Sequence, residues 1–505
     1  MWSYDFHGAG FLLNPVLMID QETTLHQMDG QRHQPQQKIT ARHILTRFGH
    51  LLSAQGVEAL VSAVFFIYLA WLDAKVYGEV MYALATGALV MKVVQFGLYY
   101  PLVSDLGRAA PEKQHQLIHR VNLIKTGLMI LSLAAVWAVT RLRGFSDSMT
   151  WVVMLVCLGC ALEALAETFF AFLRVQGRQK KEARIKIAGS ILSYGYGFSA
   201  AFWGWGAAAM GGFRLISGVI RLWSGAKESP GGVSLNPVKR SDWPAVGLTI
   251  RTAAIFALIE ILSSLYNKTN IFFMESLLGV KAVAYYSATW NLVEAVAILA
   301  SEQFLGWVIF PLLALQWWRH REESRELVRV NARWLIVAAL PIMFFLSVQS
   351  EFLIGLIYPE EYKPAVWMQT WLVWAVIIAF EHNLFAYVMM VSGGQKPLLI
   401  FTALTLVFNL LFNLTLIEPL GLLGGCLVII LTKMFMGALT FGYCQIYFKF
   451  LKWRDLILPA GLGAVMIVVY RVTLPLLSSW PATLLALTAY GLGVWKLAVT
   501  RLGRP

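Results

Sequence analysis

Charged residues are scarce in this sequence. Asp, Glu, Lys and Arg make up 14% of the 505 residues, whereas hydrophobic residues make up 58%. A soluble domain averages about 25% charged and about 45–50% apolar residues. This imbalance excludes a soluble enzyme. Because a membrane-spanning helix takes about 20 apolar residues, the composition allows about 14 spans and leaves little material for a large domain outside the membrane.

Cysteine is also rare, with four residues in the chain. Cys157 and Cys160 form a CxxC motif, but it lies within the apolar run MLVCLGCALEAL and has no second pair. Zinc and redox sites need further ligands or a different setting. We therefore expect all four thiols to be small packed side chains, and we predict neither a metal nor a cofactor.

Positive charge is concentrated in short segments between apolar runs. Such basic segments include RVQGRQKKEARIK, RHREESRELVRVNAR and FKFLKWR, whereas DAKVYGE, GVKAV and IYPEEYKPA carry one Lys each. Cytoplasmic loops of membrane proteins carry the excess of Lys and Arg. The pattern places both termini in the cytoplasm. It also relates the net charge of +13 to the membrane rather than to nucleic acid.

The apolar runs predict an all-α polytopic membrane protein with about 14 transmembrane helices. The runs lie near residues 48–71, 79–100, 119–140, 149–173, 185–204, 206–224, 246–277, 283–314, 333–356, 366–391, 397–417, 420–446, 455–472 and 481–500. The predicted organisation is a polar cytoplasmic tail at 1–47, an N-lobe at 48–224, a cytoplasmic linker at 225–245, a C-lobe at 246–446, and two helices with a cytoplasmic C-terminus at 447–505.

A weak internal repeat relates the two predicted lobes. The stretch WLDAKVYGEVMYALATGALV resembles LLGVKAVAYYSATWNLVEAV, and Lys75 and Lys281 fall at matching places in the two. Repeats of this kind are typical of secondary transporters. The sequence thus predicts two pseudo-repeated lobes of six helices, followed by two further helices at the C-terminus.

The loops predicted to lie outside the cell are all short. A membrane glycosyltransferase or polymerase usually needs a sizeable loop or domain outside the bilayer to hold its catalytic acids, and these loops leave no room for one. We therefore predict that the protein is not an enzyme and that its polar chemistry lies within the membrane.

Polar residues within four of the spans recur at helical spacing, so that each span has one polar face. These stripes are Gln55, Glu58 and Ser62; Glu260, Ser263, Ser264 and Asn267; Asn291, Glu294, Ser301 and Glu302; and Thr402, Thr405, Asn409 and Asn413. Several such faces can surround a water-filled chamber. The alternative is that they form hydrogen bonds between packed helices.

Charged side chains at mid-membrane cost about 2.5–3.5 kcal/mol each, so they usually face a cavity or a partner. Deep cations can bind an anionic substrate or pair with a glutamate, and deep carboxylates can bind a coupling ion. His382 is the histidine deepest in an apolar run, and with the preceding Glu381 it can carry protons. Adjacent residues point about 100° apart on a helix, however, so these two need not form a pair. The candidate substrate-binding residues are Lys92, Arg214, Arg251, Asn267 and Lys268; the candidate coupling-ion residues are Glu58, Glu260, Glu294, Glu381 and His382.

Several passages resemble, in order, the polysaccharide-precursor flippases of the Wzx type, which share a superfamily with the multidrug and toxic compound extruders. The passages are LAWLDAKVYGEVMYALA, FGLYYPLVSDLGR, FFAFLRVQGRQKKEARI, FFMESLLGVKAVAYYSATWNLVEAV, WVIFPLLALQ, ALPIMFFLSVQSEFLIGLIYPEEYKPA and VSGGQKPLL. The resemblance covers roughly residues 45–450 and lies in the order of features more than in one motif.

The resemblance implies two lobes that form a V around a central cavity and alternate between access to the two sides of the membrane. It implies a flippase that turns a polyprenyl-pyrophosphate-linked oligosaccharide, a repeat unit of O-antigen, capsule or exopolysaccharide, from the inner to the outer leaflet of the bacterial cytoplasmic membrane. A polysaccharide polymerase and a chain-length regulator are further partners to test. The alternative within the same fold is a cation-coupled exporter of drugs or metabolites.

The family commonly uses cavity Arg and Lys residues to engage the pyrophosphate. By position, Arg251, Lys268 and Arg214 resemble these residues most closely. The segment LAWLDAKVYG departs from the family pattern, because it lacks the arginine often found at the end of the first helix, while Glu58 stands earlier in the same span.

Overall fold

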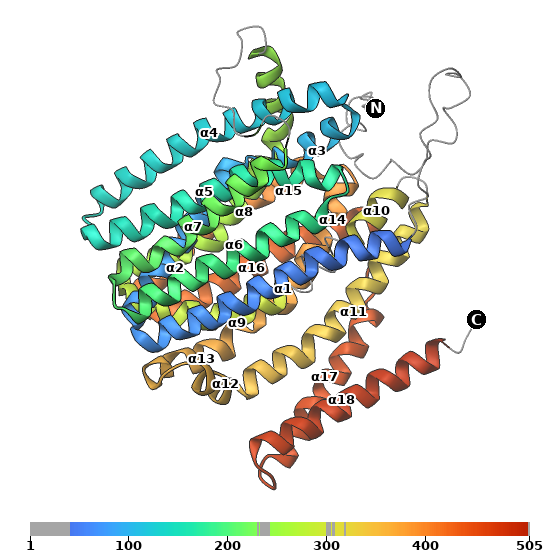
Figure 1. Cartoon of the computed structure of the whole chain (residues 1–505). Helices are drawn as coiled ribbons and strands as arrows, with labels where there is room; N and C mark the ends of the chain where they lie inside the picture. The colour runs from blue at the N-terminus through green and yellow to red at the C-terminus, as the bar shows by residue number, and fades with distance from the viewer. Residues whose placement is uncertain are drawn as a thin grey trace. The chain divides into compact units, whose positions relative to one another are not determined.

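The computed structural model describes residues 41–229, 232, 243–298, 305, 309–317 and 320–502. Within these residues the regular elements are helices, with no β-strand (Figure 1). The chain is thus an all-α polytopic membrane protein, as its apolar runs predict. Nine of the described helices are long and apolar enough to cross a membrane by length and composition. Most of the predicted tail at 1–47 lies outside the described residues, and the first helix begins at Ala41.

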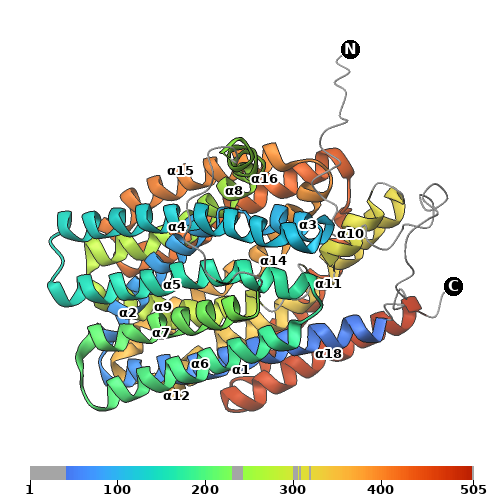
Figure 2. The ribbon, with the colours of Figure 1, turned by 45° about the horizontal axis from the view of Figure 1, so that its top comes forward.

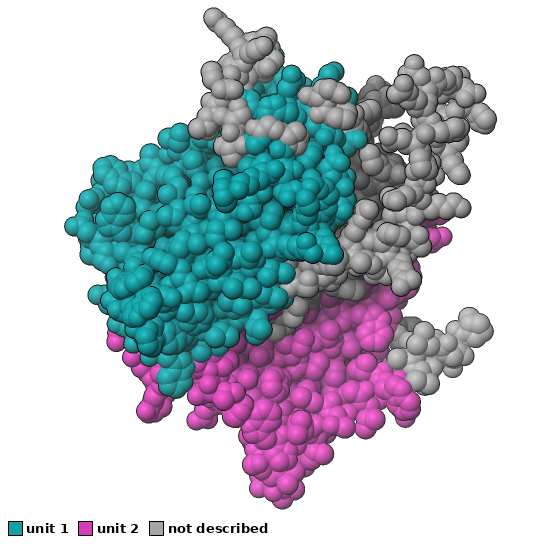
Figure 3. Space-filling view, in the orientation of Figure 1, with its two compact units in different colours: residues 1–268 teal, residues 269–505 magenta. Residues whose placement is uncertain are grey.

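The chain folds into two compact units, residues 1–268 and residues 269–505 (Figure 3). The division falls inside one helix, α8 (Trp243–Leu278), whose first part belongs to unit 1. Much of the predicted linker at 225–245 lies outside the described residues. The other helices of unit 1 are α1 (Ala41–Leu72), α2 (Ala74–Gln95), α3 (Tyr99–Arg108), α4 (Pro111–Leu142), α5 (Asp147–Val175), α6 (Gln179–Phe202) and α7 (Gly206–Lys227).

Unit 2 continues with helices that follow the remaining predicted apolar runs. They are α9 (Val280–Ile298), α10 (Phe310–Gln316), α11 (Arg321–Val348), α12 (Ser350–Ile357), a 3-10 turn (Glu360–Tyr362), α13 (Lys363–Leu372), α14 (Trp374–Val391), α15 (Gln395–Leu420), α16 (Leu422–Phe448), α17 (Trp453–Thr473) and α18 (Ser479–Leu502).

The second apolar run, near 79–100, predicts one span but forms two helices. α2 ends at Gln95, and Phe96 and Gly97 follow with φ of 44° and 59°. These left-handed values cannot continue a right-handed helix. A Cβ on Gly97 would lie 2.8 Å from the Ala257 nitrogen of α8, so glycine is needed where these segments meet. The run therefore ends in a break, after which α3 begins.

α5 is the centre of unit 1, and most of its side chains are buried. Figure 2 shows it between α4 and α7. On the side of α7, glycines allow the two backbones to meet. A Cβ on Gly159 would lie 2.3 Å from the carbonyl oxygen of Arg214, and a Cβ on Gly218 would lie 2.5 Å from the carbonyl oxygen of Gly159. Small residues at a helix interface are typical of packing in membranes.

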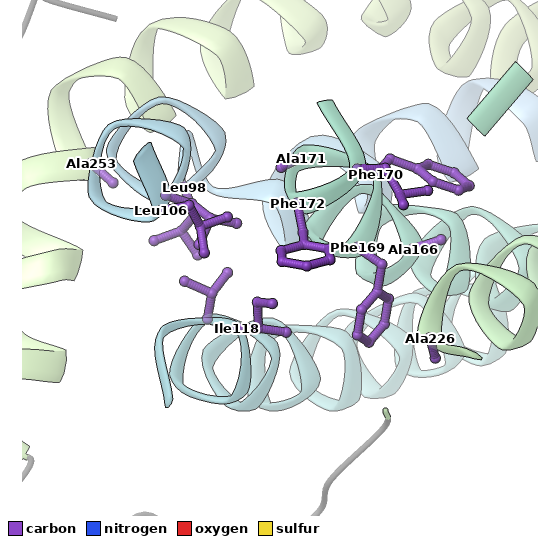
Figure 4. Packing of buried hydrophobic residues seen from close by; sticks show 13 residues of the cluster. Leu98, Leu106, Ile118, Ala166, Phe169, Phe170, Ala171, Phe172, Ala226 and Ala253 are labelled. Carbon is purple, nitrogen blue, oxygen red and sulfur yellow. The ribbon is translucent and has the colours of Figure 1, made fainter. Parts of the chain in front are cut away.

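The C-terminal part of α5 packs into an apolar cluster with α3, α4 and α8 (Figure 4). Phe169 and Phe172 of α5 lie in the same cluster as Leu106 of α3 and Ile118 of α4. Ala253 of α8 belongs to it as well. The first part of α8 is thus held by the N-terminal helices, which explains why the boundary between the units falls within this helix.

The polar stripe of α15 is buried between α15 and α16. Asn409 donates to Thr432 Oγ1 over 3.0 Å, and Asn413 donates to Asn409 Oδ1 over 3.0 Å. Both asparagines, together with Thr402 and Thr405, have no exposed surface. The interpretation of this stripe as the wall of a water-filled chamber is therefore wrong, because its side chains form hydrogen bonds within and between packed helices.

α17 and α18 pack beside α11 (Figure 1) through a small apolar cluster. Near the start of α17, Arg329 donates to both carboxylate oxygens of Asp455, over 2.9 and 3.0 Å. Burial raises the pKa of Asp455, but the hydrogen bonds from Arg329 and from the Lys452 amide outweigh it and hold the pKa below its usual value. At the other end of α11, Gln349 donates to Thr483 Oγ1 of α18 over 2.7 Å. α17 is thus bonded to the first part of α11, and α18 is bonded to the residue that follows α11.

Candidate functional site

Glu163, in the middle of α5, is surrounded by donors from α7. Arg214 Nη2 lies 2.7 Å from Glu163 Oε2, and Ser217 Oγ donates to Glu163 Oε1 over 2.6 Å. Arg221 Nη1 lies 3.7 Å from the same Oε1 atom. The three donors fall at i, i+3 and i+7, which is one face of α7. Since the Glu163 side chain is only 3% exposed, its charge needs these partners.

Arg221 links this group to α1. Its Nη2 atom lies 2.8 Å from Glu58 Oε1 and donates to Ser190 Oγ of α6 over 3.0 Å. The Glu58 side chain is 26% exposed, against 9% for Arg221, so the pair extends from the interior of unit 1 toward its surface. The N-terminal buried network, as we call Glu58, Glu163, Arg214 and Arg221, therefore joins α1, α5 and α7.

Sequence reasoning identifies two members of this network as site residues and misses the other two. It predicts Glu58 as a coupling-ion residue and Arg214 as a substrate-binding residue, and the structure brings them into one network. It does not propose Glu163 and Arg221 as site residues. The signal that could have found Arg221 is its spacing from Arg214 and Ser217, which places three donors opposite a glutamate.

A second group of charges lies nearer the end of α5. Lys186 Nζ of α6 lies 3.0 Å from both Glu167 and Glu182, and Arg174 Nη2 lies 3.0 Å from Glu167 Oε2. Arg174 Nε also donates to Glu182 over 2.9 Å. Lys125 of α4 reaches α5 from the other side, where it donates to the Ala164 carbonyl over 2.7 Å. Because Glu163 and Glu167 are one turn apart, α5 carries both groups on one face.

Lys92 and Glu260 form an ion pair between α2 and α8. Lys92 Nζ lies 3.4 Å from Glu260 Oε2, and the side chains are 41% and 29% exposed. The sequence assigns these residues to different roles, substrate binding for Lys92 and ion coupling for Glu260. The structure brings them together, so that each partly neutralises the other.

The three other predicted substrate-binding residues lie along α8. Arg251 is exposed, whereas Asn267 and Lys268 are half-buried. The amide nitrogen of Asn267 donates to the Ser263 carbonyl over 2.8 Å, while its Oδ1 atom is buried and has no hydrogen-bond partner among the described residues. Arg251 is therefore the most accessible of the five predicted substrate-binding residues.

The remaining predicted coupling-ion residues belong to unit 2. Glu294 lies half-buried on α9, and Glu381 and His382 lie on α14. The His382 ring is buried, with Nδ1 3.4 Å from Thr440 Oγ1 of α16. Within the described residues, the carboxyl group of Glu381 makes no hydrogen bond, with His382 or with any other residue. The adjacent pair is thus not a hydrogen-bonded relay in this conformation.

The arrangement holds charged side chains within apolar helices. In the described part of the chain, no group of three or more His, Cys, Asp or Glu residues could hold a metal ion. Cys157 and Cys160 are buried free thiols on α5, as are Cys426 and Cys444 on α16. The chemistry open to these sites is exchange of ion pairs: a charged side chain can release its present partner when an ion or a charged group enters, and can pair with it again when that group leaves.

A sequence profile of the family described as "Polysaccharide biosynthesis protein" matches residues 72–367. No curated protein matches the sequence at a significant level. The match starts at the end of α1 and runs into α13, so it includes both Lys92 and Glu260.

Solved structures with a similar fold include a lipid II flippase, MurJ, in an inward closed conformation. It has a TM-score of 0.64 and 10% sequence identity, over 91% of this chain and 100% of that chain. An inward-facing multidrug resistance MATE transporter of the MOP superfamily has a TM-score of 0.58 and 13% sequence identity, over 77% of this chain and 94% of that chain. A MOP superfamily transporter from Pyrococcus furiosus has a TM-score of 0.55 and 15% sequence identity, over 80% of this chain and 94% of that chain. These likenesses show that the chain has the fold of the MOP superfamily.

Proposed function

Since this chain belongs to the family of polysaccharide biosynthesis proteins, we propose that it acts in that pathway as a flippase for a lipid-linked sugar. The observation that carries the proposal is the combination of this family with a transporter fold built of membrane-spanning helices. The proposed substrate is an oligosaccharide repeat unit on a polyprenyl pyrophosphate. It moves from the inner to the outer leaflet of the bacterial cytoplasmic membrane.

The obstacle to this movement is the headgroup, not the lipid tail. Transferring a carboxylate-sized ion from water into a medium of low dielectric constant costs on the order of 20 kcal/mol in the idealised limit, and a pyrophosphate carries more charge. A path that supplies cations and water removes most of this barrier while the tail stays in the bilayer. We propose that Arg251 and Lys92 contact the pyrophosphate, with Lys268, Arg214 and Asn267 as further contacts.

The ion pairs of unit 1 support a mechanism in which partners are exchanged. Lys92 is held by Glu260 and Arg214 by Glu163, so an arriving pyrophosphate competes with a carboxylate for each cation. A carboxylate released in this way can take up a proton or a cation. The proposed coupling groups are Glu58, Glu260, Glu294, Glu381 and His382. No covalent step is required for the transport itself.

The orientation of the protein in the membrane and its partners are also part of the proposed function. The basic loops favour a cytoplasmic location for both termini. A polysaccharide polymerase is a partner expected to consume the flipped unit, and a chain-length regulator would act with it. The competing function is export of a drug or metabolite coupled to a cation, which would use the same fold with a different substrate.

The experiment that tests the function is lipid analysis of a strain lacking this gene. We expect the complete polyprenyl-pyrophosphate oligosaccharide to accumulate while the surface polymer disappears, because a block in translocation falls after assembly and before polymerisation. If both the lipid intermediates and the surface polymer are unchanged, the flippase proposal is rejected and the exporter becomes the leading function.

Complementation of that strain tests the proposed headgroup contact. Loss of a hydrogen bond to a charged group costs about 1.5–3 kcal/mol, so Arg251→Ala should lower the rate of polymer export about tenfold or more. Arg251→Lys should retain most of the wild-type rate of polymer export, because lysine keeps the positive charge. Arg184→Ala, which removes an exposed arginine from α6, is the matched control. Equal rates for Arg251→Ala and Arg184→Ala would remove Arg251 from the site.

A further inference from the structure

Glu381 is an acidic residue within an apolar helix, and its carboxyl group has no hydrogen-bond partner among the described residues. α14 reads WAVIIAFEHNLFAYVMMV, with Glu381 near its middle. Both carboxyl oxygens are buried, and neither makes a hydrogen bond. A buried polar atom without a partner is rare in a folded protein and needs an explanation.

Three other buried or half-buried glutamates within the described helices are compensated by cations. Glu163 is paired with Arg214, Glu58 with Arg221, and Glu260 with Lys92. An ionised carboxylate buried without such compensation is so unfavourable that the group takes up a proton instead. The contrast indicates that Glu381 is neutral, and therefore protonated, in this conformation.

The helices packed against α14 do not supply a charge to Glu381. α9, α10, α11, α13, α15 and α16 pack against it, and no cation from their described residues is within ion-pair distance of the Glu381 carboxyl. The nearest titratable neighbour in sequence is His382, whose ring faces Thr440 of α16. Lys433 of α16 is buried, and within the described residues it makes no hydrogen bond to the Glu381 carboxyl group.

The chemistry around Glu381 favours a proton over a metal cation. Hard cations take several oxygen ligands at once. The neighbours of Glu381 on α14 include the buried Phe380, Leu384 and Phe385, which provide none. A proton needs only the carboxyl group itself, and a neutral acid is compatible with an apolar setting.

We propose that Glu381 is the proton-binding site that couples this protein to a proton gradient. The site is filled in the conformation described, and it releases its proton in the alternate conformation, when α14 meets water. The protonation of Glu381 stands on the structure alone, whereas its role in coupling rests on the proposed function. The two parts therefore need separate tests.

Infrared spectroscopy of the purified full-length protein tests the protonation without any substrate. A protonated carboxyl group has a carbonyl stretch that a carboxylate lacks. We expect such a band at neutral pH in the wild type and in Glu418→Gln, which removes an exposed glutamate from α15. The band should be missing in Glu381→Gln and shifted in Glu381→Asp. If the wild type and Glu381→Gln have the same spectrum in this region, Glu381 is ionised and the proposal is overturned.

Transport in proteoliposomes tests the coupling. With a lipid-linked oligosaccharide as substrate, a proton gradient should accelerate flipping by the wild type and by Glu418→Gln. In Glu381→Gln, the acceleration by the gradient should be at least tenfold smaller than in the wild type. An unchanged acceleration in Glu381→Gln would overturn the coupling role. Absence of flipping in the wild type would reject the proposed function instead, and the infrared result would still decide the protonation.

Discussion

At the scale of single residues, several deep charges of the described helices form pairs that cross from one helix to another. Glu163 accepts a hydrogen bond from Ser217 and forms ion pairs with Arg214 and Arg221, and its side chain is almost fully buried. Desolvating these groups is costly, and their mutual attraction and hydrogen bonds offset that cost only while every partner is present. Removing one member therefore has a larger effect than the net contribution of the pair.

The substitution Glu163→Gln should destabilise the protein by about 3–5 kcal/mol, the usual cost of breaking a buried ion pair. The amide keeps the size of the side chain but leaves Arg214 without a carboxylate. The measurement is the thermal unfolding midpoint of the purified protein in detergent. The matched control is Glu322→Gln, since Glu322 is 82% exposed in its pair with Arg325, and exposed pairs contribute about 0–1 kcal/mol. Similar midpoints for the two variants would show that the network is not structural.

The residue types of the candidate site can be read from the sequence, but their partners cannot. Charged residues in apolar runs identify Glu58, Arg214 and Lys92 as worth attention, because such residues are expensive in a membrane. The periodicity of a helix gives the face on which a residue lies, not the helix that covers this face. For that reason the ion pair between Lys92 and Glu260 could not be predicted from the sequence, nor could the burial of Asn409 between α15 and α16.

At the scale of elements, helix positions follow from the apolar runs, while the breaks depend on packing. Each predicted run lies wholly or largely in a helix or in successive helices of the described chain. The break at Phe96 and Gly97 does not follow from the sequence, because a single glycine inside an apolar run is compatible with a continuous helix. At this break the backbone of Gly97 lies close to that of α8, a segment distant in the sequence.

The contact between α5 and α7 depends on glycine. We expect Gly159→Ala to destabilise unit 1 by about 1–3 kcal/mol, because the added Cβ would fall 2.3 Å from the Arg214 backbone oxygen and push the helices apart. Gly195→Ala is the control, since nothing lies within 4 Å of its added Cβ and alanine favours a helix. Thermal unfolding of both variants in detergent gives the comparison. A loss of stability in Gly195→Ala equal to that in Gly159→Ala would contradict the close contact.

At the scale of the whole molecule, the division of the chain does not coincide with a loop. Sequence composition marks the basic segment at 225–245 as a linker, because it is polar and rich in glycine and proline. The fold places the boundary at Lys268, since Ala253 and Glu260 of α8 pack against or pair with the first half of the chain. The first part of α8 thus follows the predicted linker in the sequence but packs with the helices that precede that linker.

The sidedness of the molecule is the last prediction, and it can be tested with single cysteines. Ser148 lies at the start of α5, and Lys180 lies beyond its other end, in the basic segment RVQGRQKKEARIK that we predict to be cytoplasmic. Both residues are exposed, and the four native thiols are buried, so background labelling should be low.

A thiol reagent that does not cross membranes should label Ser148→Cys in cells whose cytoplasmic membrane is intact. It should label Lys180→Cys only after that membrane is opened. This result would place the basic loops inside, as their excess of Lys and Arg predicts. With spans alternating in direction, it would also support cytoplasmic termini. The reverse labelling would place the basic loops outside and would contradict the predicted orientation of the protein in the membrane.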